Sequence, residues 1–283
     1  MLKLNKNVVR KGRPVGLPYQ GSKKKISKQI IEIIKQNFGT DKVIYDVFGG
    51  GGAITAECII NGLDVRYNDK SPIITGMFQR VLACDRDWLK TLMISRDEFI
   101  AIMSKADKTT DDELKLLVNS FGNNRKSYLY GQNHWQIKYE LAQQIIANHN
   151  VFGGYKQTQT YKDKLQQLER LQQLEQLQRL QQLERLEPTN LDYRTFENIK
   201  GAIFYLDPPY ENTHTDGYDD GDFDSQAFYD WAYQMSKNNI VLISSYDISD
   251  SRFECVYHFD KAKGSFHGGK NSKTEKLFMV KNS

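Results

Sequence analysis

The sequence predicts an α/β fold in which helices cover both faces of a mostly parallel sheet. Short apolar runs typical of buried strands recur along the chain, and segments with helical periodicity separate them. The strand candidates lie in residues 42–46, 64–68, 201–206, 238–247 and 275–282. The length of 283 residues exceeds one average domain but suits one α/β domain that carries an insert.

The helices between these strands are marked by their ends. Apolar residues recur at helical spacing from Ile26 to Phe38, and Gly39 is a typical residue just past a helix end. After the second strand, Ser71 and Pro72 form a favourable N-cap and first-turn pair for a new helix.

A further helix is expected in residues 225–235. Phe228, Trp231, Ala232 and Met235 lie on one face of it, as in a helix that packs against a sheet. This helix separates the strand candidates at 201–206 and 238–247, as expected for a parallel pair.

Residues 85–185 interrupt this alternation. They are mostly polar and helical in character, so we expect an inserted helical domain between the two parts of a main domain, residues 1–84 and 186–283.

The insert includes a low-complexity repeat, residues 165–187. Leucine occurs at every third position from Leu165 to Leu186, separated by Gln, Glu and Arg. Three residues turn an α-helix by about 300°, so the leucine stripe slips by about 60° per step and does not form a heptad seam. An expanded low-complexity helix is the favoured interpretation, and a period-three irregular segment or a self-association element are alternatives.

Composition and charge narrow the class of protein. The net charge of +4 is too small to establish a polyanionic partner, but the first 35 residues hold ten Lys/Arg and one acid, Glu32. The basic residues expected to meet phosphate without sequence preference are Lys3, Lys6, Arg10, Lys11, Arg13, Lys24 and Lys25. The three cysteines and five histidines show no pairing or ligand spacing, which predicts a cytoplasmic protein without a metal. No apolar stretch is long enough to predict a membrane segment, and no apolar region follows the N-terminal charges as in an export signal.

Glycines follow the first strand in the stretch DVFGGGGA, residues 46–53. Glycine between a strand and a helix lets the backbone approach a ligand, although Ile54 stands where a dinucleotide fingerprint requires glycine. Asp69 ends the next strand, where a carboxylate can accept both hydroxyls of a ribose. Together the two strand ends indicate a nucleoside site more strongly than either alone, with ordinary turns as the alternative.

The strand at 201–206 ends in Asp207-Pro208-Pro209-Tyr210. The prolines remove two backbone donors, so their carbonyls and the Asp207 carboxylate form an array that only accepts hydrogen bonds. Such an array suits an NH₂ group, and the Tyr210 ring suits a planar base. An amine conjugated to a heteroaromatic ring is a poor nucleophile, and acceptors that hold its hydrogens can free its lone pair to attack a methyl sulfonium.

With these motifs in this order, the chain resembles the Dam-type (alpha-group) DNA adenine methyltransferases, in a phage-like form. The matching stretches are YQGSKKKI at 19–26, DVFGGGG at 46–52, YNDKSPII at 67–74 and DPPY at 207–210. TNLDYRTF, residues 189–196, lies where the family has an Asp-Phe pair against the cofactor adenine.

The resemblance implies a Rossmann-like S-adenosylmethionine-dependent methyltransferase sheet with an inserted target-recognition domain. It also implies site-specific methylation of the exocyclic amine of adenine in double-stranded DNA, with the target base flipped out of the duplex. Asp207 would orient the amine, Pro208 would accept from it, and Tyr210 would stack on the base. The implied cofactor-binding residues are Tyr19, Lys23, Asp46, Phe48, Gly49, Gly51, Asp69, Ile73, Asp192, Tyr193 and Asp207.

The stretch SFGNNRKSYLYG, residues 120–131, lies where related enzymes carry DNA contacts. The candidates for DNA binding are Asn124, Arg125, Lys126 and Tyr128. Arginine can be bidentate to guanine and asparagine to adenine, while helix capping and solvation are the alternative roles.

Other functions stay open at this point. They are methylation of the exocyclic amine of cytosine or of an RNA base, methylation of a protein glutamine, and an inactive DNA-binding module. The intact motifs and Asp207 favour the adenine enzyme, which we expect to act as a monomer.

Overall fold

The computed structural model describes residues 1–18, 22–130, 135–148, 169–181, 183, 186–211, 223–263 and 274–281. The chain divides into two compact units. Unit 1 comprises Met1–Pro14, Gly21–Thr75 and Leu186–Ser283, and unit 2 comprises Val15–Gln20 and Gly76–Arg185.

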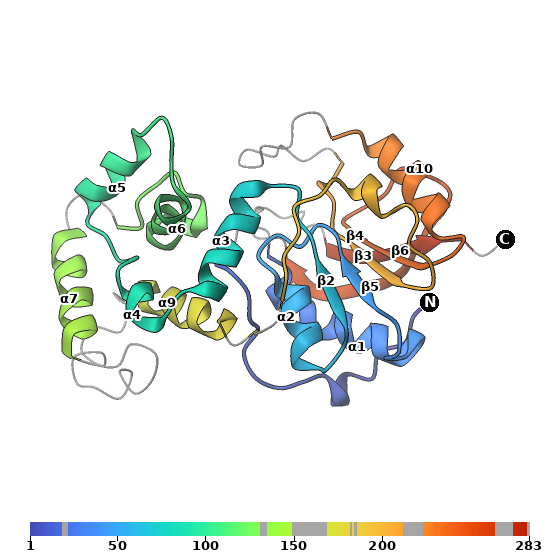
Figure 1. Ribbon diagram of the computed structural model, residues 1–283. Coiled ribbons are helices and arrows are strands. Elements are labelled where there is room, and N and C mark those ends of the chain that lie inside the picture. The colour runs from blue at the N-terminus through green and yellow to red at the C-terminus, as the bar shows by residue number, and fades with distance from the viewer. Residues whose placement is uncertain are drawn as a thin grey trace. The chain divides into compact units, whose positions relative to one another are not determined.

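Unit 1 is built on a six-stranded sheet with the strand order β2-β1-β3-β4-β6-β5 (Figure 1). Strands β1 to β4 pair in parallel, and β6 runs antiparallel to both β4 and β5. The strands are β1 (Ile44–Asp46), β2 (Val65–Tyr67), β3 (Ile203–Leu206), β4 (Ile240–Ser245), β5 (Phe253–Lys263) and β6 (Thr274–Val280). The prediction of a mostly parallel sheet is confirmed, and β5 is a strand that the sequence did not indicate.

Helices cover both faces of this sheet (Figure 1). One face packs on α1 (Ser27–Phe38) and α2 (Ala53–Ile60), and the other packs on α10 (Ser225–Met235) and the short 3-10 helix η6 (Tyr193–Phe196). Every residue of β3 is buried, because its side chains alternate between the two apolar layers. A continuous apolar strand therefore marks the centre of the sheet.

Local sequence signals account for the helix ends of unit 1. Helix α1 ends at Gly39, whose φ of 84° lies in the left-handed region that favours glycine. Helix α3 (Pro72–Ala83) begins at its proline, and the Ser71 hydroxyl accepts the N–H of Ile74 at 3.4 Å. Both ends were predicted from the sequence and are confirmed. The two short 3-10 helices near the N-terminus are η1 (Lys6–Val8) and η2 (Lys23–Lys25).

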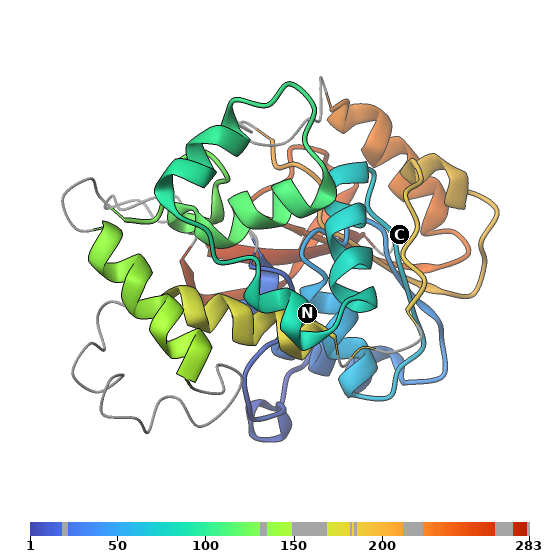
Figure 2. The same cartoon turned by 60° about the vertical axis from the view of Figure 1, so that its left-hand side comes forward.

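Unit 2 is helical in the part that the structure describes (Figure 2). Helix α6 begins with a capping box, in which the Thr109 side chain accepts the N–H of Asp112 and the Asp112 carboxylate accepts the N–H of Thr109. The elements that follow α3 are α4 (Arg86–Lys90), α5 (Arg96–Met103), α6 (Thr110–Asn119), η3 (Phe121–Asn123), α7 (Trp135–Asn148) and α9 (Glu169–Leu180).

The described part of the leucine repeat forms α9, which packs against α4 and α6. Leu174, Leu177 and Leu180 are fully buried, and Leu183 beyond the helix is 3% exposed. Successive leucines three residues apart are about 60° apart around the helix, so three of them cover about 120°, which is the width of one buried face. The repeat therefore supplies core side chains to unit 2, and its residues 165–168, 182, 184 and 185 lie outside the described residues.

Two further findings concern the described residues alone. None of their helices is both long enough and apolar enough to cross a membrane. They also contain no cluster of three or more His, Cys, Asp or Glu side chains arranged to hold a metal ion.

Candidate active site

Three aspartates lie where adjacent parallel strands end. Asp46 is the last residue of β1, Asp69 follows β2 by two residues, and Asp207 follows β3 directly. The carboxyl ends of parallel neighbours meet at one edge of a sheet, and β1 lies between β2 and β3. The connections that leave this edge therefore diverge at β1, which is where open α/β sheets bind their ligands.

The glycine loop after β1 is fastened to the end of β2. The Gly49 N–H donates to the Asn68 carbonyl and the Gly50 N–H donates to Asp69 Oδ2, both at 2.8 Å. The Tyr67 hydroxyl donates to the Gly50 carbonyl at 2.8 Å. A Cβ atom on Gly49 would lie 2.3 Å from the Tyr67 ring, so the loop can lie against this ring only with glycine at that position.

Asp46 faces the interior of unit 1. It is 1% exposed, and its carboxylate accepts the Thr55 N–H at 3.1 Å and the Thr55 hydroxyl at 2.6 Å. Burial raises the pKa of Asp46 to about 7 against the effect of these two hydrogen bonds, and the nearby carboxylates of Asp207 and Asp69 add to the rise. Asp46 therefore connects the end of β1 to the first turn of α2.

Asn68 was not singled out from the sequence, yet it positions the segment before η6. Its side chain is buried, and its Nδ2 donates to the Val47 and Leu191 carbonyls at 3.0 and 2.9 Å. Its Oδ1 accepts the Leu191 N–H at 2.8 Å and the Thr189 hydroxyl at 2.9 Å. The sequence signal that could have revealed it is an asparagine directly after an apolar strand, where its amide can bond the backbone of a neighbouring segment.

The Asp-Tyr pair that follows this segment lies next to the glycine loop. The Tyr193 ring centroid is 5.9 Å from that of Phe48, and both rings contact Phe228 with centroid distances of 5.6 Å. Asp192 caps η6 by accepting the N–H of Arg194 at 3.1 Å. The structure thus brings Phe48 and Tyr193 together as an aromatic wall.

The remaining cofactor-binding candidates are Ile73 and Tyr19. Ile73 is half-buried in the first turn of α3. Tyr19 lies outside the described residues.

Lys23 contacts the carboxylate that the sequence marked as catalytic. Its Nζ is 2.8 Å from Asp207 Oδ1, and its side chain is 9% exposed. The Tyr210 hydroxyl lies 3.1 Å from the same oxygen, and Pro208 between them in sequence is buried. Glu275 of β6 completes the group, with its Oε2 2.8 Å from the Tyr210 hydroxyl. The structure therefore unites Lys23, Asp207 and Tyr210 with a glutamate that sequence reasoning missed.

The ring of Tyr210 is held on two sides. Lys23 Nζ lies 4.9 Å from the ring centroid, and the ring of Tyr246 meets it edge to face at a centroid distance of 4.7 Å. Burial raises the pKa of the Tyr210 hydroxyl well above its usual value, and the carboxylates of Asp207 and Glu275 raise it further. Tyr210 is therefore a protonated hydrogen-bond donor at neutral pH.

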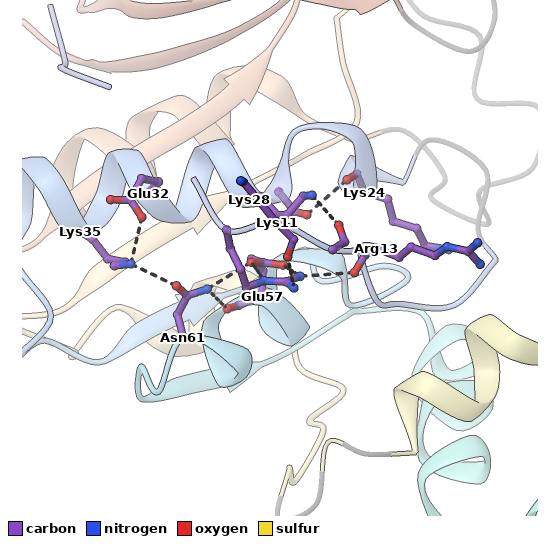
Figure 3. A network of polar contacts seen from close by, with 11 residues as sticks. Lys11, Arg13, Lys24, Lys28, Glu32, Lys35, Glu57 and Asn61 are labelled. Atoms are coloured by element: carbon purple, nitrogen blue, oxygen red, sulfur yellow. Dashed lines mark hydrogen bonds and ion pairs between the residues drawn. The ribbon is translucent and has the colours of Figure 1, made fainter. Parts of the chain in front are cut away.

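The basic N-terminal segment is fastened to α2 (Figure 3). The Arg10 guanidinium donates to both oxygens of Glu57, at 2.6 and 2.8 Å, and the Glu57 side chain is 1% exposed. Asn61 donates to Glu57 Oε1 at 3.1 Å and accepts from Lys35 Nζ at 3.1 Å. Arg10 thus has an internal carboxylate partner, in contrast to the expectation that the basic residues of this segment meet phosphate.

In unit 2, three of the four DNA-binding candidates have local partners. Asn124 Oδ1 accepts the backbone N–H groups of Lys126 and Ser127 at 2.9 and 3.0 Å, which closes a turn. Arg125 has a φ of 60°, and its guanidinium donates to Glu113 Oε2 at 2.8 Å. Tyr128, the third of these candidates, donates its hydroxyl to the Ile94 carbonyl at 3.1 Å.

The same turn exposes a cationic and an aromatic side chain to solvent. Lys126 is the fourth candidate, and Phe121 is 66% exposed. Phe121 carries no sequence signal that separates it from an aromatic residue of the core.

Comparison with protein families decides which chemistry this edge serves. Residues 19–258 match the family described as D12 class N6 adenine-specific DNA methyltransferase. The chain belongs to this family. It is an enzyme that transfers a methyl group from S-adenosylmethionine to the exocyclic amine of adenine in DNA. The resemblance to Dam-type enzymes is confirmed, and the other activities considered above are set aside.

No curated protein matches the chain. Among solved structures, the chain is similar to one titled "rRNA methyltransferase aviRa from Streptomyces viridochromogenes", at 12% identity and a TM-score of 0.40. That similarity covers 93% of this chain and 86% of the other, and it is too distant to support an argument. The family match and the strand order carry the assignment.

The residues at this edge fit S-adenosylmethionine. The Asp69 carboxylate accepts the Ser71 N–H at Oδ1 and the Gly50 N–H at Oδ2, and it stands at the strand end where a carboxylate can accept the hydroxyls of a ribose. The glycine loop presents backbone without side chains, and the half-buried Phe48 ring offers aromatic surface for an adenine ring, with the buried Tyr193 ring next to it.

Proposed function

We propose that the carboxyl edge formed by β2, β1 and β3 holds both the methyl donor and the flipped adenine. The observation that carries this proposal is the group formed by Lys23, Asp207 and Tyr210 at the end of β3. It sets a carboxylate acceptor beside an aromatic ring at the switch point of the sheet. An amine on a planar base requires both.

Different residues would bind different parts of the cofactor. The Gly49–Gly51 loop and Asp69 would hold the nucleoside and methionine parts, and Phe48 and Tyr193 would flank the adenine. S-adenosylmethionine supplies an electrophilic methyl group on a sulfonium when it is bound. Asp46 contributes indirectly, because it fixes the first turn of α2 behind the loop.

The target amine would donate one N–H to Asp207 and the other to the Pro208 carbonyl. Lys23 and Tyr210 both contact Asp207 Oδ1, so Oδ2 is the oxygen that we expect to receive the amine. Hydrogen bonds to both N–H groups draw the nitrogen out of conjugation and make its lone pair available. The methylated amine then loses a proton, which the Asp207 carboxylate can accept.

Unit 2 would read the DNA. Lys126 and Phe121 are the exposed cationic and aromatic side chains of the turn at 121–128, and such a pair suits phosphate contact and base stacking. Asn124, Arg125 and Tyr128 would support this turn through their local contacts. We propose double-stranded DNA as the substrate, a monomer as the active form, and the cytoplasm as its location.

Asp207→Ala tests the proposed chemistry. We expect kcat to fall by at least about 10²-fold, because the amine loses the acceptor that orients it. The variant should still fold, with a loss of thermal stability because the buried Lys23 loses its nearer carboxylate, and the affinity for S-adenosylmethionine is measured separately because Asp207 is also a cofactor-binding candidate. Asp41→Ala, which removes an exposed aspartate before β1, is the matched control and should leave kcat unchanged. An Asp207→Ala enzyme that keeps more than a few per cent of turnover would show that this assignment is wrong.

A further inference from the structure

Glu275 is a buried carboxylate that has no role in the methyl transfer proposed so far. It lies on β6, its side chain is 9% exposed, and it shares one face of the strand with the buried Leu277 two residues on. Four contacts surround it. Tyr210 Oη is 3.1 and 2.8 Å from its two oxygens, Lys23 Nζ is 3.5 Å from Oε1, and Ser244 Oγ is 3.4 Å from Oε2.

The Tyr210 hydroxyl can donate only one hydrogen bond within this group. The Tyr210 hydroxyl has one proton, and two carboxylates compete for it. The shorter distance is to Glu275 Oε2, at 2.8 Å, against 3.1 Å to Asp207 Oδ1. Glu275 therefore takes the Tyr210 proton, and Asp207 Oδ1 is relieved of that donor.

The group also holds more carboxylates than ammonium groups. One ammonium group, Lys23, lies between two carboxylates, at 2.8 Å from Asp207 and 3.5 Å from Glu275. Burial raises the pKa of Glu275, the Asp207 carboxylate raises it further, and Lys23 opposes the rise. A glutamate in this position draws part of the Lys23 interaction away from Asp207.

We propose that Glu275 is a positioning residue for methyl transfer. It anchors the Tyr210 hydroxyl and shares Lys23, so that Asp207 keeps its full strength as an acceptor for the adenine amine. This inference rests on the roles proposed above for Asp207 and Tyr210.

Loss of Glu275 has a defined consequence in this geometry. The Tyr210 proton turns to Asp207 Oδ1, and Asp207 no longer shares the Lys23 ammonium group with a second carboxylate. Both changes withdraw electron density from the carboxylate that must hold the amine, and the Tyr210 ring loses its anchor on β6. The chemical step should suffer, while the glycine loop and Asp69 continue to bind the cofactor.

The test compares Glu275→Ala and Glu275→Gln with Glu254→Gln, a control at an exposed glutamate on the neighbouring strand β5. Turnover is measured on DNA that lacks adenine methylation, and the dissociation constant of S-adenosylmethionine is measured by calorimetry. We expect Glu275→Ala to lower kcat by about 10- to 100-fold, the effect of one hydrogen bond to a charged group. The KM for DNA and the cofactor dissociation constant should change by less than about threefold.

Glu275→Gln keeps the side-chain shape and an acceptor oxygen, so its kcat should lie between those of the wild type and Glu275→Ala. A double variant with Tyr210→Phe shows whether Glu275 acts through the tyrosine hydroxyl. The combined loss of kcat should then be smaller than the product of the two single losses.

Two results would overturn the inference. One is a folded Glu275→Ala enzyme whose kcat is within twofold of the wild-type value. If Glu275→Ala does not fold, either of two results for Glu275→Gln decides: a wild-type kcat, or a loss of kcat that multiplies fully with the loss caused by Tyr210→Phe. Asp207→Ala separates the two proposals: if it stays active, the proposed chemistry fails, whereas an inactive Asp207→Ala beside an unimpaired Glu275→Ala refutes the role of Glu275 alone.

Discussion

A methyl group added at Gly49 would collide with a buried ring. The Cβ of Gly49→Ala would lie 2.3 Å from Tyr67 Cε2, 2.5 Å from Tyr67 Cδ2 and 3.1 Å from the Asn68 carbonyl oxygen. Carbon atoms in contact are usually about 3.5–4.0 Å apart, so the structure must yield by more than 1 Å. Tyr67 is 1% exposed, and its hydroxyl is bonded to the Gly50 carbonyl, so the ring cannot simply turn aside.

The displaced part is therefore the loop, the ring, or both. Overpacking of a buried site costs about 1–3 kcal/mol. A loop that shifts also weakens the Gly49 bond to Asn68 and the Gly50 bond to Asp69, each worth roughly 1 kcal/mol or more. We expect Gly49→Ala to lower the free energy of unfolding by about 2–4 kcal/mol and to weaken cofactor binding at least about tenfold, which corresponds to about 1.4 kcal/mol.

Urea denaturation gives the free energy of unfolding, and calorimetry gives the affinity for S-adenosylmethionine. Gly76→Ala, within helix α3, is the matched control. Its Cβ would lie 3.4 Å from Thr110 Oγ1, which is an ordinary van der Waals contact distance. Alanine favours the helix over glycine by about 1 kcal/mol, so this control should be neutral or stabilising. A Gly49→Ala protein with wild-type stability and wild-type cofactor affinity would show that the loop does not depend on glycine at this position.

Three further variants test other parts of the account. Asp69→Ala should weaken cofactor binding by on the order of 1.5–3 kcal/mol in calorimetry while DNA binding persists, and unchanged affinity would remove Asp69 from the site. Arg125→Ala should lower the free energy of unfolding by roughly 1–3 kcal/mol because Glu113 loses its partner; unchanged stability with altered discrimination between DNA sites would show that this guanidinium reads DNA instead. The raised pKa of Asp46, about 7 against an ordinary 3.8, means that the unfolded chain loses this proton first as pH rises. Stability should therefore fall between about pH 4 and pH 7, and Asp46→Asn should flatten that part of the denaturation profile; an unchanged profile would contradict it.

The parts of the fold that follow from local pattern could be predicted. The apolar run in β3 predicted a strand buried on both faces, and Pro72 and Gly39 marked helix ends where the structure has them. Strand β5 escaped prediction because it is an edge strand with a mixed pattern of apolar and charged residues, and such a pattern also suits a loop.

The leucine repeat shows how far a pattern alone can lead. Its period of three does not match a heptad, but the burial of Leu174, Leu177 and Leu180 depends on which turns of the helix contact neighbouring helices. That length is set by the packing of unit 2 and does not appear in the repeat itself.

The residues of the candidate site also differ in whether local sequence or the tertiary fold reveals them. Asp69 and Asp207 were found because strand ends and the Asp-Pro-Pro-Tyr stretch are local signals. The partners of Lys23 and Arg125 could not be found from the sequence, since both depend on residues brought close by the tertiary fold. Glu275 offered one hint, because it stands two residues from Leu277 in an apolar strand and so had to face inward.

The most direct test of the central claim is the identity of the methylated base. Purified enzyme is incubated with S-adenosylmethionine labelled in its methyl group and with double-stranded DNA that lacks adenine methylation, and the product is digested to nucleosides. The account predicts label in N6-methyladenine with the wild-type enzyme and none with Asp207→Ala. Label in N4-methylcytosine, or label in adenine that persists in Asp207→Ala, would contradict it.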